Sequence, residues 1–167
     1  RRQTPEESPE VPGFSERYED QRKVLEGLLS QPRFLPLFEG RREEVSKIAG
    51  RIADWVDPDD RVNEAPGVMG GYEDSDYQDL SYKPKNGKFG SVSELLLIPG
   101  IGDDLYRGIL SSVTVYGDER LNICQANDQT ILAFAFYHST LGGGRPLNLQ
   151  DEKATQELLD TVRTACQ

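Results

Sequence analysis

The feature that most constrains this chain of 167 residues is a strongly acidic segment that runs from position 54 to position 79. The segment holds nine carboxylates and one base, Arg61, and carries −8 of the total net charge of −10. Residues 59–90 show no helical or strand periodicity and contain five glycines and two prolines. A connection of about 30 residues is far longer than the usual loops of a small domain. Something other than burial must therefore organise it.

Carboxylates at this density repel one another unless a cation neutralises them. Oxygen donors without histidine or cysteine suit calcium. The spacing is not that of an EF-hand, because with Asp57 as the first ligand Val62 and Val68 replace the required glycine and glutamate. The charge pattern leaves two alternatives open, a calcium site and a solvated acidic loop.

Composition limits what the rest of the chain can form. Apolar residues make up 36%, below the usual share of about 45–50%, which indicates one domain with a modest core. The negative charge repels phosphate backbones and anionic membrane surfaces. The longest apolar runs, 95–98 and 131–137, are far shorter than the roughly 20 residues that cross a bilayer. The chain starts at Arg1 without a methionine or a signal peptide, so we expect a mature or trimmed fragment.

Hydrophobic periodicity predicts helices over residues 18–29, 42–56, 128–138 and 151–165. Residues 1–15 contain three prolines and few large apolar side chains, a composition typical of a flexible tail. Residues 113–116 and 121–124 alternate briefly and predict two short strands. The expected fold is mainly α with a small β element (α+β).

Residues 91–116 carry the sharpest local pattern. Ser91 and Glu94 have the spacing of a capping box, and residues 95–110 are typical of a helix-hairpin-helix with its turn at Pro99–Gly102. In DNA-binding members of that class the hairpin amides face a phosphate. Here Asp103 and Asp104 follow the turn, and residues 94–118 hold four acids and one base. The pattern therefore favours a structural scaffold over nucleic-acid binding.

No recognised catalytic motif accompanies these features, so an enzyme has little support. The one histidine, His138, lies near a predicted helix end without a nucleophile motif, and Gly142–Gly144 lacks the Lys-Ser/Thr of a P-loop. Cys124 and Cys166 are the only cysteines and have no CxxC spacing. They can form one disulfide in an oxidising compartment or remain two unrelated thiols.

Taken in order, the short motifs of the chain resemble those of the GspK family, protein K of the type II secretion system. The resemblance extends from about Leu25 to Phe134. It departs from the family at residues 124–127 and after His138, where the alternating strands of a pilin sheet are missing. The motifs that carry it are DWVDPDD at 54–60, GYED at 71–74, Tyr77, YKPKNG at 82–87, SVSEL at 91–95, PGI at 99–101, Leu105-Tyr106, VTV at 113–115, LNI at 121–123 and Ala126-Asn127.

The resemblance implies a non-enzymatic minor pseudopilin. Such a protein has an N-terminal membrane helix, a pilin-like sheet and an inserted helical domain with helix-hairpin-helix-like repeats. It would be periplasmic, anchored to the inner membrane by a helix absent from this chain. Its partners would be the I-type and J-type minor pseudopilins, in a tip complex that supports protein export across the outer membrane. The rival class is a nucleic-acid-binding helix-hairpin-helix protein of the competence type.

The resemblance also divides the chain. Residues 1–15 would be a tail, residues 16–138 the helical domain, and residues 139–167 a loop and a C-terminal helix. The helical domain would contain the acidic loop at 54–90 and the helix-hairpin-helix-like segment at 91–116, inserted in or next to the sheet. A periplasmic location favours a Cys124–Cys166 disulfide. Because the family binds calcium in its inserted domain, the implied metal ligands are Asp57, Asp59, Asp60, Glu73 and, as a further candidate, Asp76.

Overall fold

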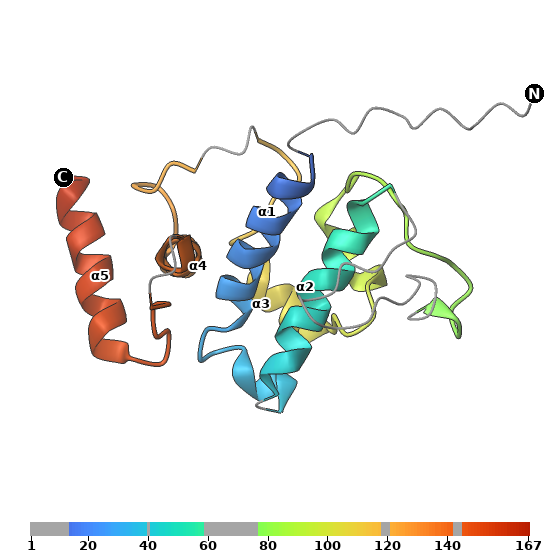
Figure 1. Ribbon diagram of the computed structural model, residues 1–167, viewed down its shortest axis with the longest axis horizontal. Helices are drawn as coiled ribbons and strands as arrows, with labels where there is room; N and C mark the ends of the chain where they lie inside the picture. The colour runs from blue at the N-terminus through green and yellow to red at the C-terminus, as the bar shows by residue number, and fades with distance from the viewer. Residues whose placement is uncertain (1–13, 40, 59–76, 118–120, 142–144) are drawn as a thin grey trace, which may run out of the picture.

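The computed structural model describes residues 14–39, 41–58, 77–117, 121–141 and 145–167 (Figure 1). Every regular element within these ranges is helical. None of these helices combines the length and apolarity that a membrane span requires. In chain order the elements are α1 (Phe14–Leu29), the 3-10 helix η1 (Leu35–Phe38), α2 (Arg42–Val56), the 3-10 helix η3 (Val92–Leu97), α3 (Asp103–Ile109), α4 (Asp128–Thr140) and α5 (Glu152–Ala165).

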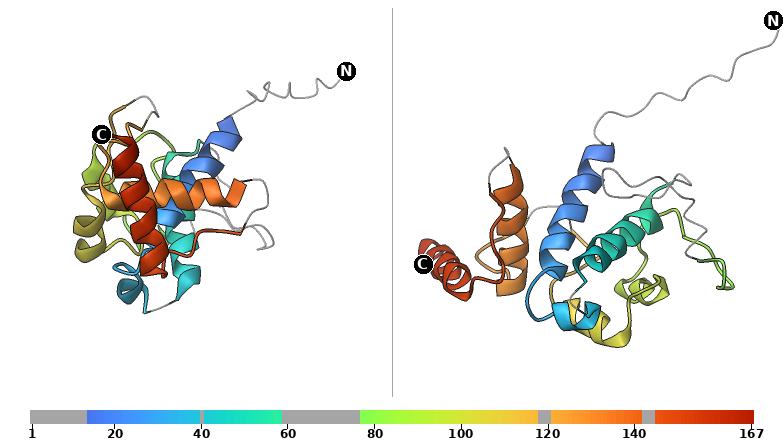
Figure 2. Two further views of the ribbon diagram at one scale, coloured as in Figure 1. Left: turned by 90° about the vertical axis from the view of Figure 1, so that its left-hand side faces the viewer. Right: turned by 60° about the horizontal axis from the view of Figure 1, so that its bottom comes forward.

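The long helices follow one another across the molecule in the order α5, α4, α1 and α2 (Figures 1 and 2). α1 packs against α4 on one side and against α2 on the other. The approach of α1 to α4 is close because residue 27 is a glycine: a Cβ there would lie 2.9 Å from the carbonyl oxygen of Ala133 and 2.9 Å from the Phe136 ring. α1 is therefore the central helix of the arrangement.

One hydrophobic cluster joins α1, α2, η3 and α3 and also includes Ala133 of α4 (Asp128–Thr140). Phe34 and Leu29 are its largest fully buried side chains from the first part of the chain, and Ile98 and Ile109 are their counterparts from the second part. The other buried members are Leu28, Phe38, Val45, Ile48, Trp55, Tyr77, Leu95, Ile101, Leu105 and Ala133. Both flanks of the acidic segment therefore contribute to the same core.

The helix predictions for residues 42–56, 128–138 and 151–165 are confirmed, with α4 continuing to Thr140 and α5 starting one residue later than expected. Asn127 and Asp151 cap α4 and α5: their side chains accept hydrogen bonds from the amides of Thr130 and Ala154, at 2.9 Å and 3.0 Å. Residues 1–13 of the predicted tail lie outside the described residues, and α1 begins at Phe14.

The small β element is not seen in the described residues, so the strands predicted at 113–116 and 121–124 are wrong there. Side chains bind the amides that a strand ladder would need. Thr114 Oγ1 accepts from the Tyr116 amide at 3.1 Å, and Asn122 Oδ1 accepts from the Cys124 amide at 3.2 Å. Such local bonds stabilise turns in competition with strands. Tyr116 is also 82% exposed, so no buried face would hold a sheet together.

The hairpin-like segment differs from the prediction in its first element, which is the 3-10 helix η3 rather than an α-helix. Gly100 turns the chain with φ of 92°, a backbone conformation that glycine adopts without strain. Ile98 and Ile101, on either side of the turn, are buried. Arg51 of α2 donates a hydrogen bond to the Pro99 carbonyl at 3.1 Å. The turn is therefore fixed against α2.

Candidate functional site

The acidic segment begins in the last turn of α2, where the helix geometry makes negative charge unfavourable. Asp54 is buried in that turn, and Asp57 is the C-cap residue, with its amide bonded to the Ala53 carbonyl at 3.0 Å. The last turn contains no base. Carboxylates at a helix C-terminus face the negative end of the helix dipole.

The two described flanks of the segment meet at a pair of aromatic rings. Trp55 and Tyr77 are each 3% exposed, and their ring centroids lie 6.3 Å apart. Phe89 stacks with Trp55, with ring centroids 6.4 Å apart, and the Gly87 amide donates to the Trp55 carbonyl at 3.2 Å. Because residues 55 and 77 are in contact, the two flanks meet, and this contact forms the base of the acidic loop.

Of the five predicted metal ligands, the described residues include Asp57 alone. Asp59, Asp60, Glu73 and Asp76 lie outside the described residues, in the stretch 59–76. The described part of the chain brings together no group of three or more metal-ligating side chains. The one predicted ligand that it does place, Asp57 at the end of α2, is a hard oxygen donor of the kind that calcium prefers.

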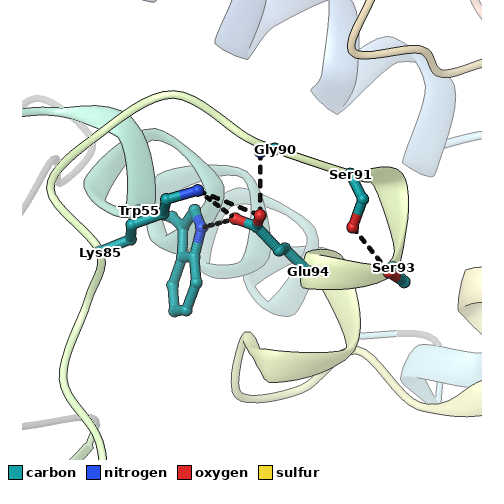
Figure 3. Close-up of polar contacts among 6 residues, drawn as sticks. All are labelled: Trp55, Lys85, Gly90, Ser91, Ser93 and Glu94. Atoms are coloured by element: carbon teal, nitrogen blue, oxygen red, sulfur yellow. Dashed lines mark hydrogen bonds and ion pairs between the residues drawn. The ribbon is translucent and has the colours of Figure 1, made fainter.

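Glu94 is the polar centre at the base of the loop, and none of its three partners was predicted from the sequence. Its carboxylate accepts hydrogen bonds from the Trp55 indole at 3.1 Å, from Lys85 Nζ at 2.9 Å and from the Gly90 amide at 2.9 Å (Figure 3). These donors come from α2 and from the stretch that precedes η3. The carboxylate of Glu94, which itself lies in η3, therefore joins η3 to the end of α2 and to residues 85–90.

The electrostatics of Glu94 follow from these contacts. The hydrogen bond from Lys85 is the main cause that lowers the pKa of Glu94 below the ordinary glutamate value, and the bonds from Trp55 and Gly90 act in the same direction. Partial removal of the carboxylate from water raises its pKa, but by less than these hydrogen bonds lower it. Glu94 is therefore ionised at neutral pH and pairs with Lys85 as a charged group.

The capping box predicted at Ser91 and Glu94 is only half correct. Glu94 does reach back to a backbone amide, but the amide is that of Gly90 rather than that of Ser91. Ser91 makes no capping bond and instead contacts the Ser93 hydroxyl at 2.7 Å (Figure 3). The sequence signal for Glu94 was its spacing from Ser91. Its bond to Trp55, 39 positions earlier, has no local signature.

The hairpin turn does not have the geometry of a phosphate site. The side of Gly100 on which a Cβ would sit faces Ile48 and the guanidinium of Arg51, both from α2. Asp103 and Asp104 occupy the first turn of α3, where carboxylates are stabilised by the helix dipole and would repel a phosphate. These contacts suit a turn that holds two parts of a scaffold together.

Cys124 and Cys166 are joined by a disulfide in the structure, with Cα atoms 5.4 Å apart. The bond connects the turn before α4 to the end of α5. It borders a hollow of about 340 Å³ that both cysteines line, together with Asn127, Ile131 and Val162. The C-terminal helix is therefore tied to the remainder of the chain at its far end.

Comparisons with known proteins are consistent with this helical scaffold. A family model described as type II secretion system (T2SS), protein K, matches residues 11–118. No curated protein matches the chain. Among solved structures, a chain in the crystal structure of the GspK-GspI-GspJ complex from the enterotoxigenic Escherichia coli type 2 secretion system has a TM-score of 0.53 and 21% identity. That similarity covers 83% of this chain and 53% of the other.

The matched residues include α1, α2, the acidic segment, Glu94 and α3, and they make up well over half of the chain. The match therefore places the chain among the components of a secretion system. Within it, the chain belongs to the family of type II secretion system protein K. The resemblance seen in the order of the sequence motifs is thereby confirmed. The chain spans about half the length of the Escherichia coli chain that shares its fold.

The Glu94 cluster yields a pH-dependent prediction. Replacing Glu94 by glutamine should lower the melting temperature at neutral pH, because Lys85 loses its charged partner and the buried indole loses a strong acceptor. A carboxylate with a lowered folded-state pKa stabilises above its unfolded-state pKa, and this stability is lost as the pH falls through the folded-state value. The difference in melting temperature between the two proteins should therefore shrink in acid. Thermal melting of both proteins, followed by Trp55 fluorescence at several pH values, measures this difference in melting temperature.

The matched control is Glu157→Gln, which removes the same charge from an exposed pair with Lys153, whose closest N–O distance is 3.7 Å. Exposed pairs of this kind contribute little to stability, so the control should melt like the unmutated protein. Equal melting temperatures for Glu94→Gln and the unmutated protein at neutral pH would contradict the assigned role of Glu94.

Proposed function

We propose that this chain is the helical part of a minor pseudopilin, a non-enzymatic component at the tip of the type II secretion pseudopilus that supports protein export across the outer membrane. The observation that carries the proposal is the family match over residues 11–118. The role needs a rigid scaffold rather than a reactive centre. The single cluster that joins α1, α2, η3 and α3 provides such a scaffold.

The proposed partners are the I-type and J-type minor pseudopilins. The support is the fold shared with a chain of the GspK-GspI-GspJ complex, of which this chain covers 53%. A pilin-like sheet and an N-terminal inner-membrane helix would then belong to the parts of the protein that this chain does not include. The domain itself would work in the periplasm, an oxidising compartment that suits the Cys124–Cys166 bond.

The secretion role is tested by deleting the gene for the full-length protein. Type II substrates should then disappear from the culture medium and accumulate in the periplasm, and the intact gene should restore export. The full-length protein, purified from solubilised membranes, should bring the I-type and J-type pseudopilins with it. Unchanged export from the deletion strain would refute the proposal. Duplex DNA binding that weakens with added salt would instead support the rival nucleic-acid function.

We further propose that the acidic loop binds calcium through carboxylates drawn from Asp57, Asp59, Asp60, Glu73 and Asp76. Two features of the described residues support this proposal. Asp54 and Asp57 lie at the negative end of the α2 dipole with no base in the last turn. The Trp55–Tyr77 contact also brings together the two described ends of the acidic segment.

Bound calcium would add positive charge to this acidic segment. Repulsion among the carboxylates would become shared attraction to one centre, and the loop would be held against the Trp55 end of α2. A ligand that binds the folded state alone stabilises it by RT ln(1 + [L]/Kd), about 2.7 kcal/mol at a free concentration of 100 times Kd.

Calcium binding is tested by melting the domain with calcium, with magnesium and with EGTA. Calcium should raise the melting temperature by several degrees, whereas magnesium should do so poorly because it resists dehydration and demands octahedral geometry. Asp57→Asn and Glu73→Gln should each reduce the calcium shift. Asp79→Asn is the matched control, since it removes a carboxylate of the same segment that is not a predicted ligand. Identical melting in all three solutions would mean that the loop is merely solvated.

A further inference from the structure

α5 lies at one edge of the molecule, beyond α4 and away from α2 and α3 (Figures 1 and 2). It packs on α4. Thr155 and Leu159 are its buried side chains, and most of its remaining residues are exposed. Leu159, together with Ile131 of α4 and Leu149 before α5, is buried outside the main hydrophobic cluster. The buried side chains of α5 therefore lie outside the main cluster.

The polar links of α5 and its preceding turn to the rest of the described chain are weak. Arg163 pairs with Asp128 at the start of α4, but the two side chains are 54% and 48% exposed. Exposed ion pairs contribute little because solvent screens them. Just before the helix, Gln150 donates to the Ser30 carbonyl at 3.1 Å, also in an exposed position. The covalent bond at Cys166 is thus the strongest attachment of the far end of α5.

The disulfide is also accessible. Cys124 is exposed, and both cysteines line the hollow of about 340 Å³ between the start of α4 and the end of α5. The walls of this hollow include Ile131 of α4 and Val162 of α5, so it follows the seam between the two helices. A thiolate from another molecule can approach the sulfur of Cys124 without prior unfolding of the main core.

We propose that the Cys124–Cys166 disulfide is a latch whose reduction releases α5 from α4 while the α1–α2–η3–α3 core stays folded. The reductant is a dithiol. One of its thiolates attacks a sulfur of the pair, breaks the S–S bond and forms a mixed disulfide, and its second thiol then displaces the protein sulfur. Cys124 and Cys166 each end as a thiol, and the dithiol is oxidised to a disulfide.

Release of α5 would uncover an apolar surface. α4 has apolar side chains around most of its circumference, as expected for a helix covered on more than one side. α1 covers one side, with Gly27 set against Ala133. Without α5, Ile131 and its neighbours on the other side would face solvent. The latch therefore controls whether the Ile131 side of α4 is covered or faces solvent.

Hydrogen exchange read by mass spectrometry tests the latch on the whole chain, with dithiothreitol as the dithiol. In the reduced protein the amides of α5 should exchange about tenfold faster or more, while those of α2 should change by less than about twofold. The double variant Cys124→Ser/Cys166→Ser should show the same pattern without reductant. Arg163→Gln, which breaks only the exposed ion pair, is the control and should leave α5 protected.

Two results would overturn the proposal. If the amides of α5 keep their protection in the fully reduced protein, packing on α4 alone holds the helix and the disulfide is no latch. If α2 loses protection together with α5, the bond stabilises the whole domain rather than one helix. Free-thiol counts by mass spectrometry establish that reduction was complete in either case.

Discussion

The structure depends on the carboxylate of Glu94, which binds the Trp55 indole, the Lys85 ammonium and the Gly90 amide at once. An indole N–H that is buried without an acceptor would be costly, because it would lose its bond to water and gain nothing. Glu94 supplies that acceptor from a segment that is 39 positions away in sequence. The same contact fixes the end of α2 against η3, and the carboxylate is stabilised in its charged form by Lys85. A local ion pair thus determines where the indole ring lies.

The position of the ring determines in turn where the acidic segment begins and ends. Trp55 contacts Tyr77 and stacks with Phe89, so chain on both sides of residues 59–76 converges on one aromatic group. Closing a loop that carries this much negative charge confines like charges and works against stability. The buried aromatic contacts and the Glu94 bonds offset that cost at the base of the loop, and a bound cation would offset it within the loop. The C-terminal helix lies outside this arrangement, since its buried Leu159 is not part of the main cluster and its far end is secured by the disulfide.

Much of the helical fold could be predicted from the sequence, because the spacing of apolar residues is a local property of each helix. α2 and α5 were predicted to within one residue for that reason. The strands at 113–116 and 121–124 were wrong because alternation does not show that Thr114 and Asn122 bind the neighbouring amides. At the site, the spacing of Ser91 and Glu94 indicated a carboxylate that reaches back to an amide. It could not indicate Trp55 or Lys85, since these meet Glu94 only through the tertiary fold. The acidic segment was evident from composition alone, whereas the contact between Trp55 and Tyr77 that closes it was not.

The most direct test of this account is the indole N–H signal of Trp55 in a two-dimensional NMR spectrum recorded over a range of pH. The chain has one tryptophan, so the signal needs no further assignment. Because the N–H donates to Glu94, its chemical shift should follow the titration of that carboxylate, with a midpoint below the ordinary glutamate value, and it should exchange slowly with water at neutral pH. An indole N–H that exchanges as fast as that of an exposed tryptophan, with a shift that ignores the titration of Glu94, would contradict the central role of this contact.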